Sequence, residues 1–147
     1  MKKIKILIVE DDLKQSELLA IMIKRFFARF DISGKNEDFN NGQSFGYSDN
    51  LSIDFATDCK EASIKIQSFN YSLITLDGSL ADGDHGRDLL KLMNFDEIKR
   101  TIIISGDLKF IEECRENNML CLQKPIPINT LEEFLFEINR SLDLCSP

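Results

Sequence analysis

The chain has 147 residues, of which 43% are hydrophobic and 29% charged, a composition that suits one globular domain with one core. Its formal net charge of -7 opposes tight binding to nucleic acid or to an anionic membrane, because both need clustered Lys and Arg. No apolar run is long enough to span a bilayer, and acids follow the basic start too soon for a signal peptide. We therefore expect one cytoplasmic domain over residues 1–147, with no direct nucleic-acid or membrane partner.

The four cysteines, at positions 59, 114, 121 and 145, form no CxxC pair and no regular framework. In a chain with no sign of export, we expect them to be reduced thiols. Cys114 and Cys121 do not have the spacing of a zinc motif with His85, which is the only histidine. The cysteines therefore indicate neither a disulfide framework nor a zinc site.

Short apolar runs alternate along the chain with segments of helical periodicity. The run from Ile4 to Val9 is β-branched and ends at three acids, as in a strand buried on both faces of a parallel sheet. From Lys14 to about Arg29, apolar residues recur at helical spacing and predict the first helix. Further strands are expected over 52–56, 73–76, 101–104 and 119–122, and further helices over about 58–69, 87–93, 108–117 and 129–142.

Two of these helices begin with a capping-box pattern. Asp58 is followed by Glu61 three residues later, and Asn129 can cap the last helix with Glu132 completing the box. Residues 31–50 instead mix Gly, Asn and Ser without a sustained period, and we expect them to form a long surface loop inserted between the first helix and the second strand.

Alternating βα units predict an α/β fold, namely a doubly wound five-stranded parallel sheet with helices on both faces. Such sheets bind ligands beyond the carboxyl ends of their strands. The residues that follow the predicted strands are polar, and they are Glu10, Asp11 and Asp12, then Asp77, then Ser105, then Lys124. The sequence thus predicts one polar site at one edge of the sheet.

Carboxylates at neighbouring strand ends repel one another, so Glu10, Asp11 and Asp77 need a cation to stay ionised together. Mg²⁺ is the natural choice because it prefers oxygen ligands and bridges carboxylates to phosphates. An oxygen of Asp77 can then attack phosphorus while Lys124 and the Ser105 hydroxyl hold the equatorial oxygens. Any one of these residues alone reads as a solvated cap, a turn residue or a surface lysine, whereas the set in this order is specific.

At these positions the chain resembles the receiver domain of two-component response regulators. The resemblance rests on Glu10-Asp11-Asp12 after an apolar strand, Leu76-Asp77, Ile104-Ser105-Gly106 and Lys124-Pro125, and it covers nearly the whole chain. It implies the flavodoxin-like receiver fold with strand order 2-1-3-4-5, and a Lys-Pro peptide bond that is typically cis.

The resemblance also implies a role for each site residue. Asp77 is the phosphoacceptor, and Mg²⁺ is bound by Asp77, by Asp11 directly, by Glu10 through water and by the backbone carbonyl of Ser79. Lys124 and Ser105 contact the phosphoryl group. Asp107, like Ser79, occupies a position that tunes how fast the acyl phosphate hydrolyses.

The partners that the resemblance implies are a sensor histidine kinase or a histidine phosphotransfer protein as donor, and an unidentified downstream protein that reads the phosphorylated surface. Members of the family often dimerise through the face of their fourth and fifth helices, here 108–117 and the C-terminal helix. No output domain is expected within residues 1–147, and no enzymatic activity beyond self-phosphorylation from a donor and slow autodephosphorylation.

Some positions depart from the family pattern. Ala81 replaces a proline, and Gly86 comes one residue later than the glycine of the family. Cys121 stands where the switch hydroxyl, Ser105, normally has an aromatic partner on the fifth strand. His85 lies in the loop after the acceptor and, as a lone loop histidine, is expected to be solvated rather than to act as a base.

Two further functions stay open at this point. A phosphorylation-independent receiver-like scaffold for protein interactions would account for the atypical loop and for Cys121. A phosphatase with an aspartyl nucleophile is the third possibility, although Asp77-Gly78-Ser79 lacks the second acid expected two residues after the nucleophile.

Overall fold

The computed structural model describes residues 3–29 and 50–145, with the backbone alone for 143–145. Within these residues the strands are β1 (Ile4–Val9), β2 (Leu51–Ala56), β3 (Leu73–Leu76), β4 (Thr101–Ser105) and β5 (Leu120–Gln123). The helices are α1 (Leu13–Arg29), α2 (Cys59–Ser68), α3 (Gly86–Leu90), α4 (Phe95–Lys99), α5 (Leu108–Glu116) and α6 (Ile128–Cys145), with a 3-10 turn, η2, at Ala81–Gly83. Nearly all of the insertion expected at 31–50 lies outside the described residues.

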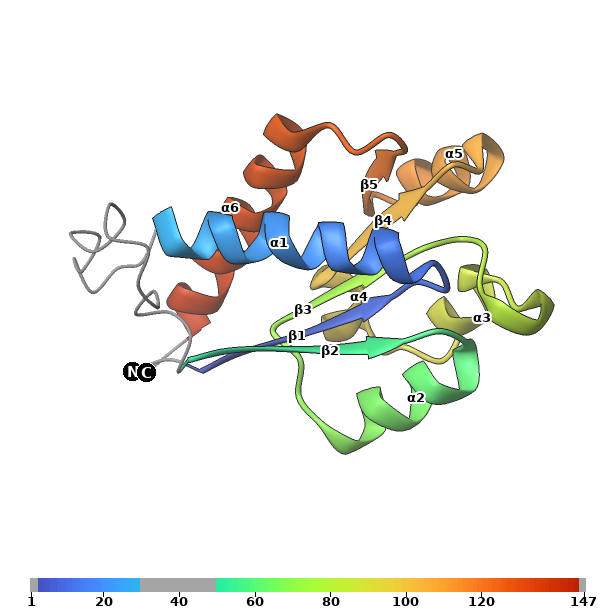
Figure 1. Ribbon diagram of the computed structural model, residues 1–147, viewed down its shortest axis with the longest axis horizontal. Helices are drawn as coiled ribbons and strands as arrows, with labels where there is room; N and C mark the ends of the chain where they lie inside the picture. Colours follow the sequence, from blue (N-terminus) through green and yellow to red (C-terminus); the bar gives the residue numbers. More distant parts are fainter. Residues whose placement is uncertain (1–2, 30–49, 146–147) are drawn as a thin grey trace.

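The strands form one parallel sheet in the order β2-β1-β3-β4-β5 (Figure 1). Helices α1 and α6 cover one face, and α2 to α5 lie on the other. This confirms the predicted doubly wound α/β fold and its strand order. Because all strands run the same way, their carboxyl ends meet at one edge of the sheet.

Each strand contributes side chains alternately to two apolar layers. On β1, Ile6 and Ile8 pack towards α1 and α6, whereas Leu7 and Val9 pack towards α2, α3 and α5. The central strands β3 and β4 are buried at every position. The continuous apolar runs that predicted doubly covered strands therefore correspond to the middle of the sheet.

The predicted helix over 87–93 is corrected by the structure. It is shorter, as α3, and a separate helix, α4, follows it. The start of α4 is a full capping box, in which the Asn94 side chain accepts from the Glu97 amide and the Glu97 side chain accepts from the Asn94 amide, both at 2.8 Å. This Asn-x-x-Glu pattern is a helix-start signal that was present in the sequence.

The predicted cap at Asn129 is also wrong. Helix α6 begins at Ile128, and the Leu131 amide donates to the Pro127 carbonyl at 3.0 Å, so Asn129 lies inside the first turn. The Glu132 carboxylate is paired with Arg29 of α1 rather than with a cap. The other predicted cap is confirmed, because the Asp58 side chain accepts from the Glu61 amide at 2.7 Å.

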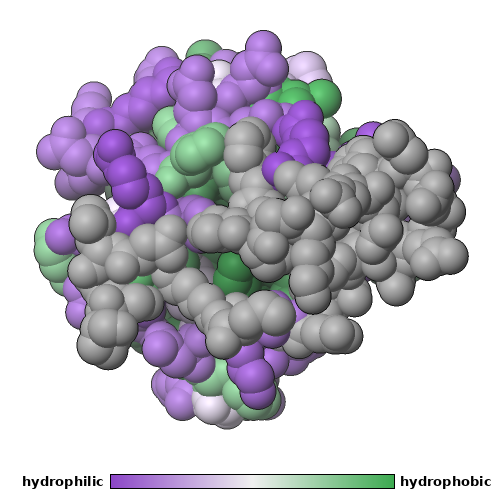
Figure 2. Space-filling view, turned by 90° about the vertical axis from the view of Figure 1, so that its left-hand side faces the viewer, coloured by the Kyte–Doolittle hydropathy of each residue, from purple (hydrophilic) through white to green (hydrophobic). Residues whose placement is uncertain are grey.

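The face at the amino ends of the strands carries none of the predicted site residues. Its described surface is mostly hydrophilic, with apolar residues showing in places (Figure 2). Among residues 3–29 and 50–145, no helix combines the length and the apolar character needed to cross a bilayer.

Candidate functional site

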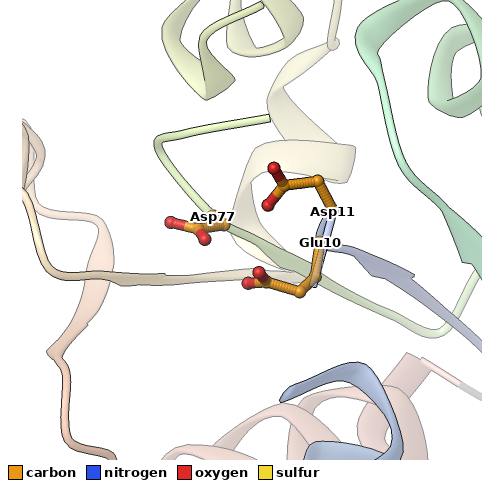
Figure 3. Close-up of side chains that lie close together, drawn as sticks. All are labelled: Glu10, Asp11 and Asp77. Carbon is orange, nitrogen blue, oxygen red and sulfur yellow. The ribbon is translucent and has the colours of Figure 1, made fainter. Parts of the chain in front are cut away.

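Three carboxylates converge at the carboxyl ends of β1 and β3 (Figure 3). One oxygen each from Glu10, Asp11 and Asp77 lies within 4.8 Å of the other two. Glu10 and Asp77 are buried, with 7% and 6% of their surface exposed, whereas Asp11 is exposed. The set offers only oxygen ligands, which fits a hard cation such as Mg²⁺.

The backbone fixes these side chains. The Asp77 amide donates to the Val9 carbonyl at 3.0 Å, which extends the pairing of β1 with β3 by one residue and brings Asp77 beside Glu10. The Ser79 amide donates to Asp77 Oδ1 at 3.3 Å, so the backbone of the following loop helps to orient the Asp77 carboxylate. The metal-ligand role of the Ser79 carbonyl stays a prediction.

Lys124 bridges the two buried acids. Its Nζ donates to Asp77 Oδ2 at 2.9 Å and to Glu10 Oε2 at 3.0 Å, and it also contacts the Gln15 side chain. The Lys124 amide donates to the Ser105 carbonyl at 2.9 Å, and the Lys124–Pro125 peptide is cis, as the resemblance implied. The Lys124 ammonium is therefore close enough to Asp77 to pair with an anionic group bound to that carboxylate.

For both Glu10 and Lys124, burial and pairing with an opposite charge shift the pKa in opposite directions. Burial, with the neighbouring Asp77 carboxylate adding to it, raises the pKa of Glu10 to about 7 despite the opposing effect of Lys124. Burial by itself would lower the pKa of Lys124, but its bonds to Asp77 and Glu10 outweigh burial and raise it. Lys124 thus stays charged, whereas Glu10 is partly protonated near its pKa of about 7, and a bound cation would favour loss of that proton.

Ser105 and Asp107 lie at the junction of β4 and α5. Ser105 is 1% exposed, and its Oγ accepts from the Asp107 amide at 3.0 Å. Asp107 caps α5 by accepting from the Phe110 amide at 3.2 Å, and this bond, with a smaller effect of His85, lowers the pKa of Asp107. The Ser105 hydroxyl is therefore joined through Asp107 to the start of α5.

Gly86, which comes one residue later than the glycine of the family, packs against Asp77 at the end of the loop 77–86 between β3 and α3, which we call the acceptor loop after the predicted role of Asp77. A Cβ at Gly86 would lie 2.4 Å from the Asp77 carbonyl oxygen, and the Gly86 amide donates to the Gly78 carbonyl at 2.8 Å. The loop between them takes left-handed backbone at Asp82 and Gly83, with φ values of 60° and 76°. The close approach to Asp77, rather than spacing along the chain, makes glycine necessary at position 86.

No protein-family model and no curated protein matches the chain. Solved structures do match, among them a CheY-like response regulator receiver domain from Methylobacillus flagellatus, with a TM-score of 0.66, 20% identity and 93% and 99% of the two chains covered. A two-component response regulator from Clostridium difficile matches with a TM-score of 0.67 and 24% identity over 95% and 98%. The signal receiver domain of a DNA-binding response regulator from Colwellia psychrerythraea 34H gives 0.68 and 16% over 94% and 99%.

The chain has the fold of a response regulator receiver domain. In this receiver fold, the carboxyl edge of the sheet gathers Glu10, Asp11, Asp77, Ser105 and Lys124, as the sequence predicted.

Cys121 lies on β5 opposite Ile103 and is 6% exposed. Burial raises the pKa of its thiol to about 12, so it is an uncharged packing residue.

The expectation for His85 is wrong, because the side chain is not simply solvated. Its Nδ1 accepts from the Arg87 amide at 3.0 Å and caps α3, and its Nε2 lies 3.5 Å from Asp107 Oδ2. The ring stands edge-on to Phe110 with centroids 4.7 Å apart, and 26% of the side chain is exposed. In this receiver fold His85 joins the acceptor loop to α5.

Phe110 is the residue near the site that the sequence did not reveal. It lies in the first turn of α5 and is 1% exposed. On an amphipathic helix its position looks like that of any core residue, so periodicity gives no sign that its ring lies next to the acceptor loop.

Replacing Asp11 by Asn is expected to weaken Mg²⁺ binding, because it removes the charge of the one solvent-exposed carboxylate among the three that could hold the ion. Isothermal or fluorescence titration of both proteins with Mg²⁺ measures the change. Replacing Asp12, which is also exposed and adjacent, by Asn is the control. Equal affinities of the Asp11→Asn and Asp12→Asn proteins would remove Asp11 from the metal site.

Mg²⁺ affinity is also expected to fall with pH. With a pKa of about 7, Glu10 must lose a proton before the cluster is fully charged, so the affinity for Mg²⁺ decreases by about tenfold from about pH 8 to about pH 6.

The stability of the metal-free protein has the opposite pH dependence, because it decreases as the pH rises. Folded Glu10 holds its proton more tightly than the unfolded chain, with its pKa of 4.5, so the free energy of unfolding falls as pH rises from about 4.5 to about 7.

In Glu10→Gln both dependences are expected to flatten across this range, since the titrating group is gone. Chemical denaturation and Mg²⁺ titration at matched pH values provide the measurements. A Glu10→Gln protein with an unchanged pH profile would assign the titration to another group.

Proposed function

We propose that this chain is a phosphoacceptor receiver in two-component signal transduction, in which Asp77 accepts a phosphoryl group from a phosphohistidine donor in a Mg²⁺-dependent reaction. The observation that carries the proposal is the position of Asp77. A buried carboxylate lies between two other acids and a lysine, at the ligand-binding edge of a receiver fold.

The proposed reaction is an in-line displacement at phosphorus. An oxygen of Asp77 forms the new bond, the P–N bond to the donor imidazole breaks, and the imidazole nitrogen keeps the electron pair and takes up a proton. Mg²⁺, held by Asp11, Glu10, Asp77 and the Ser79 carbonyl, would supply the positive charge that lets a carboxylate approach the anionic phosphoryl group. Lys124 moves little, since its Nζ is already 2.9 Å from Asp77 Oδ2 and can pair with a phosphoryl oxygen there.

Ser105 can contribute without losing its present contact. A hydroxyl has one hydrogen to donate and two lone pairs, so it can donate to a phosphoryl oxygen while Oγ still accepts from the Asp107 amide. Formation of the acyl phosphate therefore pulls on the residue that is bonded to the cap of α5.

The proposed partners and the proposed dimer face rest on the resemblance to receiver domains. The donor is a sensor histidine kinase or a histidine phosphotransfer protein, a downstream protein reads the phosphorylated surface, and the surface of α5, β5 and α6 is the proposed dimer face. We propose further that residues 1–147 form one cytoplasmic receiver domain whose only chemistry is self-phosphorylation and slow autodephosphorylation.

The test is the intact mass of the protein after incubation with acetyl phosphate, a small acyl phosphate donor, with Mg²⁺ or with EDTA. We expect a gain of one phosphoryl group with Mg²⁺ only, and loss of that gain after treatment with hydroxylamine, which cleaves acyl phosphates. A protein that neither binds Mg²⁺ nor gains mass from acetyl phosphate or from a panel of histidine kinases would instead be the phosphorylation-independent scaffold. Catalytic turnover of an external phosphate ester would point to the phosphatase.

A further inference from the structure

The residue after the acceptor touches α5 directly. A Cβ at Gly78 would lie 2.8 Å from Phe110 Cδ2 and 2.8 Å from Ser105 Oγ. The backbone next to Asp77 is therefore in close contact both with the switch hydroxyl and with an aromatic ring. Because interiors are close-packed, a shift of the Gly78 backbone towards Phe110 is expected to displace this ring.

His85 also packs against the Phe110 ring. It packs edge-on to Phe110, and it is anchored at its own base by the Arg87 amide and by the bridge between Ser79 and His85 in the acceptor loop. Phe110 thus lies against the acceptor loop at two points, Gly78 and His85. Arg87, which pairs with Glu113 of α5 at 2.8 Å, adds a solvent-exposed link of little energy.

The backbone of Phe110 is also hydrogen-bonded to the N-terminal cap of α5. Its amide donates to the cap residue Asp107, whose own amide donates to Ser105 Oγ. The cap is therefore bonded to the Ser105 hydroxyl, and the Phe110 ring lies beside the Gly78 backbone. On β5, by contrast, the Cys121 side chain is small and buried, and its Sγ contacts the carbonyl of Met119.

We propose that Phe110, held by His85, transmits the state of Asp77 to α5 in this chain, so that the aromatic element of the switch lies on α5 and not on β5. This inference rests on the proposed function, since it needs the acyl phosphate at Asp77. Phe110 and His85 are positioning residues, because they act through Ser105 and Gly78 and do not touch the phosphoryl group.

The experiment compares two readouts on each protein. Intact mass gives the extent of phosphorylation by acetyl phosphate with Mg²⁺, and hydrogen–deuterium exchange gives the protection of amides in residues 107–117. In the unmodified chain, phosphorylation is expected to change exchange in this segment. In Phe110→Leu the extent of phosphorylation is retained and the change in exchange is lost.

His85→Asn provides a second variant that is expected to fold, because Asn is a good helix cap and can still accept from the Arg87 amide. It removes the ring that packs on Phe110, and its exchange response is expected to shrink. Cys121→Ala is expected to leave the response unchanged.

Phe26→Leu is the matched control for loss of packing. Phe26 is likewise 1% exposed, but it lies on α1 in the apolar layer on the opposite face of the sheet. The control should keep both phosphorylation and the response of residues 107–117. A full response in phosphorylated Phe110→Leu, or an equal loss in Phe26→Leu, would overturn the inference and leave the proposed function intact. Absence of any mass gain in the unmodified chain, with acetyl phosphate or with kinases, would contradict the proposed function and the inference with it.

Discussion

Asp77→Asn is expected to abolish the phosphoryl gain entirely while the protein stays folded. The amide nitrogen and oxygen of Asn are too weakly nucleophilic to attack phosphorus. The fold is retained because Asn has nearly the same shape and its carbonyl can still accept from Lys124. Removing one of two adjacent buried acids also relieves their mutual repulsion.

Intact mass after incubation with acetyl phosphate and Mg²⁺ measures this loss, and thermal unfolding monitors the fold. Asp82→Asn is the matched control, since Asp82 lies in the same loop and its φ of 60° is a conformation that Asn adopts readily. The control protein is expected to gain the phosphoryl group like the unmodified chain. An Asp77→Asn protein that is still labelled would move the acceptor to another residue.

Gly86→Ala is expected to lower the free energy of unfolding by about 1–3 kcal/mol, as overpacking of a close-packed site does. The new Cβ would lie 2.4 Å from the Asp77 carbonyl oxygen, a backbone atom that cannot rotate away. Alanine has the higher helix propensity, but its advantage over glycine is at most about 1 kcal/mol, so the steric term prevails. Since the displaced atom belongs to the acceptor residue, the rate of phosphorylation should fall as well.

Gly106→Ala is the paired substitution in the other loop of the site. Apart from its two chain neighbours, no atom of residues 3–29 and 50–145 lies within 4 Å of the Cβ that would be added there, so the expected change in unfolding free energy is within about 0.5 kcal/mol. Urea denaturation of the two variants beside the unmodified protein gives both values. Equal stabilities of Gly86→Ala and Gly106→Ala would contradict the packing argument.

The strands and the site edge could be predicted because they depend on strong and local signals. Buried parallel strands are continuous apolar runs, and their ends are marked by the polar residues Glu10, Asp77, Ser105 and Lys124. A parallel sheet then brings those ends together, whatever the details of the crossovers.

The errors have physical causes of a different kind. The capping box at Asn94 does not predict a helix by itself, because α4 is only five residues long and has no apolar period of its own. Asn129 fits a cap pattern, but the carbonyl of Pro127 already begins the helix, and Glu132 finds Arg29 on a neighbouring helix. Tertiary contacts decide such cases, and the same holds for His85 and Phe110, whose pairing joins two loops and a helix.

The contact between Gly78 and Phe110 also has a consequence for sequence divergence. The space beside the acceptor is shared by positions 78 and 110, and here the ring of Phe110 occupies it. A side chain at position 78 and a large ring at position 110 therefore exclude each other. Homologous chains that diverge from this one are expected to change the two positions together, with a bulkier residue at 78 accompanied by a smaller or more exposed residue at 110.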